Sequence, residues 1–266
     1  GKESGARILG AHLEGPYLNQ AFHGALNPNH LREPDIKEAI ELVDSGGDIL
    51  KMVTLAPELP GGLDLVELLT TRGIIPSLGH SGATFDETVR AAQAGLSHIT
   101  HIFNAMSKMH HRAPGPAGAA LFSNRLSAEV IADGQHVHPA VLKMLWFLKG
   151  DHLALVSDAI SAAGLPDGRY RFSGQEIKVT GGRAALPGGR LAGSTTTVLD
   201  GARNMIQLAG LTLPQVIHLA STNPARILGL EGKGRLAEGC DADLILLDSG
   251  MNPVMVMIEG KIFFRK

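Results

Sequence analysis

The chain has 266 residues, 44% of them hydrophobic but only 4% aromatic, with 33 glycines and a formal net charge of −2. A chain of this length buries a large core, and an aromatic-poor, glycine-rich composition favours a tightly packed α/β fold over an aromatic-cored β-sandwich. The nearly balanced charge, without any block of like charges, argues against nucleic acid and anionic membrane surfaces as partners.

Cys240 is the only cysteine, which excludes an intrachain disulfide framework and predicts a reducing, cytoplasmic location. No apolar stretch reaches the roughly 18 residues of a membrane-spanning helix, because charges or glycines interrupt the longest runs. The first residues, GKESGARILG, do not have the pattern of a secretory signal peptide. We therefore expect neither a membrane segment nor a disulfide-stabilised fold.

Strand-like and helical stretches alternate from residue 7 to about 160. The apolar runs predict strands near 7–13, 49–55, 74–79, 98–103, 127–132 and 153–157. Such alternation is typical of parallel strands joined by crossover helices. The fold class expected is therefore an α/β barrel of the (β/α)8 type.

Helix boundaries between these strands carry their own signals. Thr84 and Glu87 have the spacing of a capping box, which predicts a helix that starts there and stops at Gly95. Pro139 suits the first position of a second helix, which is expected to end at Gly150. Both helices fit the role of crossover segments between parallel strands.

The pattern changes after residue 159. Residues 169–193 predict short antiparallel strands with Gly-rich turns, 195–208 and 214–228 predict helices, and the last residues are β-like again. Six barrel strands are two short of eight, and a complete barrel takes about 250 residues. We predict an incomplete barrel over residues 1–230, part of a small β-sandwich over 231–266, and a longer parent polypeptide.

Four of the apolar runs end in an ionisable residue: Glu14 in HLEGP, His80 in SLGHSG, His101 in HITHIF and Asp158 in LALVSDA. The active site of a parallel barrel lies at the carboxyl ends of its strands, where these residues would meet. One carboxylate and two imidazoles suit a divalent metal such as zinc or iron with an open position. A free carboxylate beside it, Asp158, suits proton transfer.

Each of these residues taken alone also has a simpler interpretation. Glu14 fits an exposed residue at a strand end, His80 a structural histidine, and Asp158 a carboxylate that caps a backbone turn. His101 is favoured over His98 as a ligand because it stands where the strand turns. The case for a metal site rests on the combination.

Three further positions are candidates for supporting roles. His12 shares a strand face with Glu14 and is expected as a buried, hydrogen-bonded neighbour. Arg112, in the Gly/Pro-rich HHRAPGPAGA, suits a phosphate or carboxylate, although a solvated loop arginine is the alternative. His136 could donate to a substrate oxygen, whereas His138 fits a helix N-terminus.

Other functional signatures are missing from the sequence. It contains no P-loop, no GxGxxG after a strand, no GxSxG and no CxxC. The glycine-rich LPGGRLAGS lacks the lysine of a nucleotide loop but could line a pocket with backbone groups. The remaining histidines are interpreted as surface or structural residues: His23, His30, His110, His111, His152 and His218.

Seven motifs in this order resemble the N-acetylglucosamine-6-phosphate deacetylases of the amidohydrolase superfamily. They are HLEGPYLN, GHSGAT, THIFNAM, RAPGPAGA, ADGQHV, LVSDA and LAGSTTT, and the resemblance spans nearly the whole chain. It implies hydrolysis of the acetamide of N-acetylglucosamine 6-phosphate to glucosamine 6-phosphate and acetate. It also implies that the six strands are the third to eighth of the barrel.

The resemblance further implies the roles of individual residues. Glu14, His80 and His101 would hold the metal, and Asp158 would act as general base and then acid. Residues that meet the sugar phosphate would be Ala25, Asn104, Ala105, Arg112, Asp133, His136, Leu191, Ala192 and Gly193. A homodimer is implied as well, with Arg112 reaching the neighbouring site.

One departure concerns the substrate. Many family members have Gly-(Ala/Thr)-His-Asn-Pro where this chain has Ala25-Leu26-Asn27 after Gly24. Leu26 cannot donate a hydrogen bond, and His23 is the candidate to replace that contact. The alternatives to the expected function are a related amidohydrolase acting on N-acetylgalactosamine 6-phosphate or another amide, and a non-catalytic barrel module.

Overall fold

The computed structural model describes residues 5–266 and is built on a six-stranded parallel sheet with the order β1-β2-β3-β4-β5-β6. Every neighbouring pair in it is parallel. The strands are β1 (Ala11–Glu14), β2 (Leu50–Leu55), β3 (Ile75–Leu78), β4 (His98–Ile99), β5 (Ser127–Ile131) and β6 (Leu153–Val156). The expected incomplete α/β barrel is confirmed.

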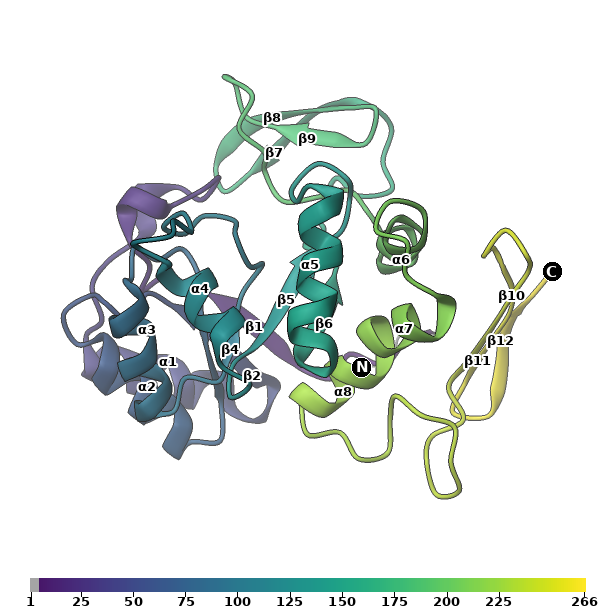
Figure 1. The fold of residues 1–266 in the computed structure, drawn as a ribbon, viewed down its shortest axis with the longest axis horizontal. Helices are drawn as coiled ribbons and strands as arrows, with labels where there is room; N and C mark the ends of the chain where they lie inside the picture. Colours follow the sequence, from purple (N-terminus) through teal and green to yellow (C-terminus); the bar gives the residue numbers. More distant parts are fainter. Residues whose placement is uncertain (1–4) are drawn as a thin grey trace.

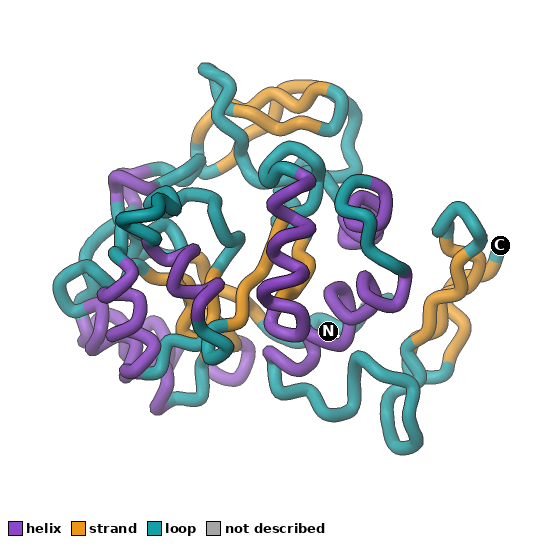
Figure 2. The backbone as a smooth tube through the Cα atoms, in the orientation of Figure 1, coloured by secondary structure: helices purple, strands orange, loops and turns teal. Residues whose placement is uncertain are grey.

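Helices connect the strands and cover the outer side of the curved sheet (Figure 1). They are α1 (Ile36–Gly46), α2 (Gly62–Thr71), α3 (Phe85–Ala94), α4 (Gly115–Phe122) and α5 (Pro139–Lys149). After the last barrel strand come α6 (Val198–Gln207), α7 (Leu213–Ile217), a π-helical turn (His218–Thr222) and α8 (Asn223–Ile227). Figure 2 shows the strands of the six-stranded sheet toward the middle of the molecule, with these helices around them.

The predicted helix boundaries are confirmed. Thr84 and Glu87 form the capping box of α3, and Gly95 ends that helix with a φ of +123°. Pro139 is the first residue of α5, and His138 is its N-cap, with a ring nitrogen that accepts from the amide of Ala140. These local signals fix where the crossover helices begin.

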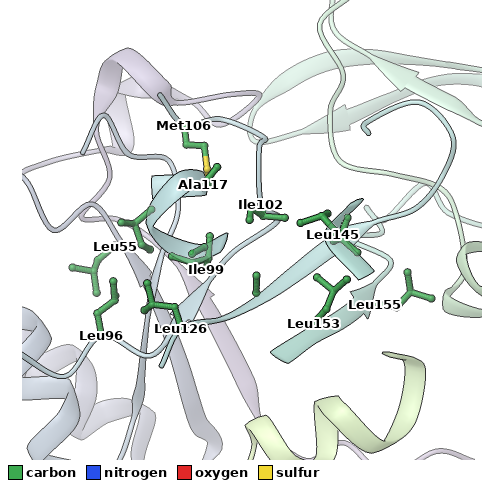
Figure 3. Close-up of a cluster of buried hydrophobic side chains, with 14 of the residues drawn as sticks. Leu55, Leu96, Ile99, Ile102, Met106, Ala117, Leu126, Leu145, Leu153 and Leu155 are labelled. Atoms are coloured by element: carbon green, nitrogen blue, oxygen red, sulfur yellow. The ribbon is translucent and has the colours of Figure 1, made fainter. Parts of the chain in front are cut away.

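A continuous apolar core fills the space between the sheet and the helices (Figure 3). Leu55 from β2, Ile99 from β4 and Leu153 from β6 are fully buried in it, together with Leu142 and Leu145 of α5. Each side chain of this kind contributes about 1.5–3 kcal/mol when buried. This core holds the strand ends, and the residues that follow them, in place.

Among residues 5–266 the sheet does not close into a full barrel, because β1 and β6 pair on one side only. A cavity of about 310 Å³ opens between them, lined by Gly10, His12, Leu155 and Ile227 among others. His12 was expected to be buried, but it is exposed on the wall of this cavity. Its expected hydrogen bond exists, to Thr54 Oγ1 at 2.6 Å.

Two small antiparallel sheets complete the fold. The cap sheet consists of β7 (Gly168–Phe172), β8 (Gln175–Thr180) and β9 (Arg183–Ala185), at the top of Figure 1. The tail sheet consists of β10 (Leu244–Leu247), β11 (Pro253–Ile258) and β12 (Lys261–Arg265), at the right. The domain boundary at residue 230 stays a prediction.

The cap sheet has a core of its own. Ile177, Val179 and Ala184 are buried there with Ala25, which follows β1, and with Ala192. This second cluster joins the cap sheet to segments at the carboxyl ends of the barrel strands. None of the helices in residues 5–266 combines the length and apolar character that a bilayer crossing requires.

Candidate active site

Glu14, His80 and His101 meet at the carboxyl ends of three parallel strands. Glu14 is the last residue of β1, while His80 and His101 each follow their strand, β3 and β4, by two residues. Glu14 Oε1 lies 2.9 Å from His80 Nε2 and 3.0 Å from His101 Nε2, and the two Nε2 atoms are 3.2 Å apart. The structure thus brings together the three residues that the sequence singles out.

The chemistry of these three atoms requires a positive charge between them. His80 Nδ1 lies 2.9 Å from the Phe22 carbonyl oxygen, which can only accept, so Nδ1 carries the hydrogen. His80 Nε2 therefore presents a lone pair to the Glu14 carboxylate in the neutral imidazole. Two acceptors at 2.9 Å need a proton or a cation between them.

The spacing also fits a metal ion. A tetrahedral zinc ion with bonds of about 2.0–2.1 Å to nitrogen and oxygen sets its ligand atoms about 3.3 Å apart. The three separations in this cluster, 2.9, 3.0 and 3.2 Å, are close to that value. No other group of three or more His, Cys, Asp or Glu residues in residues 5–266 has the spacing of a metal site.

Electrostatic interactions in the cluster also favour a positive charge at this point. Burial alone would raise the pKa of Glu14, but hydrogen bonds from His101 and His80 hold it well below its usual range. Burial alone would lower the pKa of His101, whereas Glu14, Asp158 and Glu129 raise it to about 9. The surroundings therefore stabilise positive charge at this point, which is what a bound cation needs.

Three residues of the site adopt left-handed backbone conformations that non-glycine residues seldom use. The φ angles are +49° at His80, +28° at His101 and +48° at Asp158. Such conformations cost on the order of 1–3 kcal/mol each and cluster at functional sites. Interactions in the rest of the fold offset this strain and hold the three side chains in these orientations.

The same strain explains one wrong boundary. The fourth strand was predicted to reach residue 103, but β4 ends at Ile99. His101, Phe103 and Ala105 all have positive φ angles, of +28°, +76° and +47°, which extended strands do not allow. His101 therefore sits in a tight turn, not on the strand.

Asp158 follows β6 by two residues and faces the same region. Burial raises its pKa to about 6, with a further contribution from the charges of Glu14 and Glu129. A carboxyl group with this pKa is ionised at neutral pH and is still basic enough to take up a proton. Asp158 thus has the pKa that proton transfer beside the cluster would require.

Glu58 is a supporting residue that the sequence analysis missed. Its carboxylate accepts hydrogen bonds from Asn19 Nδ2 at 3.0 Å, Ser81 Oγ at 2.7 Å and the Gly82 amide at 2.6 Å. These bonds tie together the loops that follow β1, β2 and β3, directly next to His80. The available signal was a glutamate just past a strand end, in TLAPE.

Glu129 is a second missed residue, in the middle of β5. Its carboxylate accepts from the His101 backbone amide at 3.3 Å and pairs with His98 Nε2 at 3.4 Å. Burial would raise its pKa, but His98, His12 and His101 lower it. A carboxylate inside an apolar strand was the signal. His98 itself stays outside the metal cluster, as expected.

Comparison with known proteins identifies the family. A model described as "Amidohydrolase family" matches residues 2–263. This chain belongs to the amidohydrolase family. Members bind metal, and the cluster of Glu14, His80 and His101 is where this amidohydrolase has the side chains to do so.

Similar proteins are named as deacetylases of amino-sugar phosphates, and the names differ in the sugar. The chain is 41% identical over 259 residues to N-acetylgalactosamine-6-phosphate deacetylase of Escherichia coli O157:H7, covering 97% of this chain and 69% of the relative. It is 40% identical to N-acetylglucosamine-6-phosphate deacetylase of Lysinibacillus sphaericus, covering 98% and 68%. The chain thus spans about two thirds of the length of these relatives.

Solved structures extend the likeness to the fold. The N-acetylglucosamine-6-phosphate deacetylase of Mycobacterium smegmatis, a mutant in complex with N-acetyl-D-glucosamine-6-phosphate, has a TM-score of 0.92 at 38% identity, covering 96% of this chain and 68% of that one. The Thermotoga maritima enzyme has a TM-score of 0.91 at 38% identity, covering 97% and 70%. These proteins share the amidohydrolase fold with this chain.

His136 and Asp133 form a buried pair on the loop after β5 of this amidohydrolase. Asp133 Oδ2 lies 2.7 Å from His136 Nδ1, and Asp133 Oδ1 accepts from the amides of Gln135 and His136 at 2.9 Å. Burial would raise the pKa of Asp133, but His136 and these amides lower it. The carboxylate therefore holds His136 Nδ1–H and leaves Nε2 for another partner.

Several of the candidate substrate-binding residues contact the residues of the metal cluster, their neighbours in the chain, or Asp158. Asn104 Nδ2 donates to the carbonyl of His101 at 3.2 Å, and the Ala105 carbonyl accepts from the amide of Ser81 at 3.2 Å. Gly193 lies so close to Asp158 that an added Cβ would stand 2.9 Å from the Asp158 backbone carbonyl oxygen. Leu191 and Ala192 lead directly into this contact.

Arg112 is different, because it is exposed and lies on the loop before α4. Its Nη1 is 2.8 Å from His111 Nε2, and no hydrogen bond or ion pair within residues 5–266 joins it to Glu14, His80 or His101. The sequence placed Arg112 among the substrate residues. Within this chain it points to no site that the structure assembles.

His23 does not supply a free donor in place of Leu26. Its Nδ1 lies 2.8 Å from the Leu26 carbonyl oxygen and its Nε2 lies 3.0 Å from Arg190 Nη1. Both ring nitrogens therefore have partners. The idea that His23 replaces the missing substrate contact directly is not supported.

Proposed function

We propose that this protein hydrolyses the acetamide of an amino-sugar phosphate, with N-acetylglucosamine 6-phosphate as substrate and glucosamine 6-phosphate and acetate as products. The observation that carries the proposal is the convergence of Glu14, His80 and His101 within about one metal-ligand spacing, beside Asp158. The names of the relatives supply the substrate class.

Glu14, His80 and His101 are proposed to hold one divalent cation, zinc or iron by ligand type. A cation bound there would supply positive charge that polarises the acetamide carbonyl and acidifies a water molecule. His80 Nδ1–H, held by the Phe22 carbonyl, keeps the His80 ring turned toward this point. Glu58 supports the same loop from the other side.

Asp158 is proposed as the general base and then the general acid. It takes a proton from the attacking water and delivers that proton to the nitrogen of the tetrahedral intermediate as the C–N bond breaks, so that the amine leaves neutral. His136, held through Nδ1 by Asp133, is proposed to help polarise the acetamide carbonyl. The remaining contacts to the sugar are assigned to Ala25, Asn104, Ala105, Leu191, Ala192 and Gly193.

Arg112 is proposed to bind the phosphate of a substrate held in the neighbouring subunit of a homodimer. Its exposure, and the lack of any hydrogen bond or ion pair from it to Glu14, His80 or His101 within residues 5–266, fit this role better than a role in its own site. An arginine fork matches a phosphate through paired hydrogen bonds. We also propose a cytoplasmic location, which the single cysteine, Cys240, favours.

A second substrate deserves equal testing. The relative at 41% identity is an N-acetylgalactosamine-6-phosphate deacetylase. Leu26 removes a donor that many N-acetylglucosamine-6-phosphate deacetylases have. The two sugars differ only in the direction of one hydroxyl group, so a change in one donor is enough to alter the preference.

The deciding experiment measures acetate release from both sugar phosphates by the metal-loaded protein, with the metal content determined in the same sample. We expect turnover of at least one of them, and none after chelation of the metal. Acetate release from neither substrate by a protein with bound metal would exclude the proposed reaction. A protein that binds no metal would instead favour the non-catalytic barrel module.

A further inference from the structure

A single arginine on the cap sheet side fastens the loop that follows β1. Arg190 Nη1 donates to His23 Nε2 at 3.0 Å and to the Gly24 carbonyl oxygen at 2.8 Å. These residues are 167 and 166 positions apart in the sequence. A contact over that separation is made by the folded cap, and no local turn would form it.

The direction of these hydrogen bonds is fixed by chemistry. A guanidinium can only donate, so His23 Nε2 is the acceptor and the ring hydrogen resides on Nδ1. Nδ1 lies 2.8 Å from the Leu26 carbonyl oxygen, which accepts it. Arg190 therefore sets the tautomer of His23, and through that tautomer it closes the turn from His23 to Leu26.

The cap sheet holds the same loop at two further points. Gln175 Nε2 donates to the Ala25 carbonyl oxygen at 3.0 Å, and the Asn27 amide donates to Ser173 Oγ at 2.9 Å. Ala25 is buried in the apolar cluster of the cap sheet. The loop over residues 23–27, which we call the clamped loop, is thus part of the cap in structural terms.

The clamped loop is one wall of the candidate active site. Gly24, with a φ of +58°, approaches the His80 ring so closely that an added Cβ would lie 3.1 Å from His80 Cε1 and 3.4 Å from Ala105 Cβ. A glycine is required by both the backbone angle and this contact. Any shift of the clamped loop changes the space next to His80.

Arg190 also leads directly into the opposite wall. Leu191 to Gly193 follow it in the chain, and Gly193 packs on the Asp158 carbonyl, where an added Cβ would be 2.9 Å away. The Ser194 amide donates to the same carbonyl at 2.8 Å. One residue thus links the wall beside His80 to the wall beside Asp158.

We propose that Arg190 is a positioning residue for substrate binding, which holds the clamped loop and the segment Leu191–Gly193 at a fixed separation through His23 and Gly24. This inference rests on the proposed function, because the two walls carry the residues assigned to the sugar. Arg190 acts on the affinity for the amino-sugar phosphate. The proton transfer at Asp158 is left unchanged.

Kinetics of three variants test the role. Arg190→Gln and His23→Ala each raise KM for the sugar phosphate about tenfold and leave kcat within about threefold, because they remove binding without touching the reacting atoms. The double variant raises KM no more than the stronger single variant, since both break the same contact. Arg190→Lys, which keeps a donor for Gly24, restores part of the affinity.

A control variant and a second measurement separate this role from general destabilisation. Arg169→Gln removes an exposed ion pair with Glu176 on the same cap sheet and leaves KM unchanged. Amide hydrogen exchange in the metal-loaded protein without substrate becomes faster over residues 24–27 in Arg190→Gln and stays the same in Arg169→Gln.

The outcomes against the proposal are distinct. The proposal is overturned if KM is unchanged in Arg190→Gln, or if kcat falls by the same factor in place of a rise in KM. Additive effects on KM in the double variant would also overturn it, because Arg190 would then contact the substrate itself. If the wild-type protein deacetylates neither sugar phosphate, the proposed function fails and hydrogen exchange alone decides. Unchanged exchange over residues 24–27 would then refute the clamp.

Discussion

The two ends of the six-stranded sheet use buried polar side chains in opposite ways. At the carboxyl ends, Glu14, His80 and His101 face each other at 2.9–3.2 Å with atoms that can bind a cation. At the amino ends, Lys149 Nζ donates to the carbonyl oxygens of Ala120, Ser123 and Leu126 at 2.6–2.8 Å. One end presents side chains that can bind a ligand, whereas at the other end the Lys149 ammonium is hydrogen-bonded within the protein.

Asn223 repeats the pattern at the amino end. It is fully buried, and its Nδ2 donates to the carbonyls of Gly150 and Leu153 at 3.2 and 2.7 Å. Strained φ angles, by contrast, gather at the carboxyl ends, at His80, His101 and Asp158. Residues suited to chemistry and residues that stabilise the fold thus lie at opposite ends of the sheet, as in other α/β barrels. Variants at each end should therefore fail in different ways.

The largest expected effect is on turnover. Asp158→Asn removes the proton acceptor and should lower kcat by about 10³-fold, within the range for general acid–base catalysis. Metal content should be unchanged, because Asp158 is not among the three converging ligands. Steady-state acetate release and metal analysis of the same preparation check both parts.

Asp151→Asn provides the matched control for that variant. Asp151 is an exposed carboxylate at the amino end of β6, so its loss should leave kcat within about twofold. Substantial activity in Asp158→Asn would remove Asp158 from the role of general base.

At the opposite end the expected effect is on stability. Lys149→Met leaves three carbonyl oxygens without their donor and should lower the free energy of unfolding by about 3 kcal/mol. Burial already lowers the pKa of Lys149 to about 8. Replacing Lys149 with Met avoids the cost of burying this ammonium, but the loss of three hydrogen bonds is larger. Urea denaturation measures the change.

Activity distinguishes the two ends in this variant. At a temperature where the protein stays folded, kcat per mole of Lys149→Met should equal that of the wild type. Lys143→Met on the exposed face of α5 serves as the control and should change neither quantity. A selective loss of kcat in Lys149→Met would show that the amino end also governs the site.

Glu58 lies at the carboxyl end but acts through other residues, and its loss should have an intermediate effect. Glu58→Ala leaves the Gly82 amide, Ser81 and Asn19 without an acceptor. We expect kcat/KM to fall about thirtyfold as the loop of His80 loosens, with a loss of stability of about 2 kcal/mol. Kinetics and urea denaturation are compared on the same samples.

The control for Glu58→Ala is Glu67→Ala, on the exposed side of α2. If Glu58→Ala lowers stability but leaves kcat/KM of the folded protein unchanged, Glu58 belongs with the structural residues of the amino end.

How much of the fold and of the candidate site could be predicted from the sequence depends on how local each signal is. The strand ends at Glu14 and His80 and the caps at Thr84 and Pro139 follow from neighbouring residues, and the structure has them where they were expected. The end of β4 was misplaced because the left-handed turn at His101 is imposed by its surroundings. Propensity scales carry no trace of such tertiary strain.

Long-range partners account for the rest. Glu58 forms a hydrogen bond with Ser81, 23 positions away, and Glu129 with His101, 28 positions away. A glutamate in the sequence does not indicate which distant residue it will contact. His23 and Arg190, 167 positions apart, are the extreme case. His12 was expected to be buried, and it is exposed because β1 pairs on one side only within the described residues.

The smallest expected effect is a pH dependence that belongs to the carboxyl end alone. Burial, with the charges of Glu14 and Glu129, raises the pKa of Asp158 to about 6. The base must be ionised to accept a proton, so activity is full above this pKa and falls as the pH drops through it. Below the midpoint kcat/KM should decrease about tenfold per pH unit. A bound cation favours the ionised carboxylate, so the midpoint should lie no higher than about pH 6.

Stability should change with pH in the opposite sense. A carboxyl whose folded pKa is raised contributes stability that is present below its unfolded pKa and lost as the pH rises through about 6. Asp158→Asn, which resembles the protonated form, should therefore raise the thermal midpoint of the metal-free protein at pH 8 but not at pH 4. Equal shifts at both pH values would mean that the ionised Asp158 is not destabilising. The raised pKa would then not be a property of the folded site.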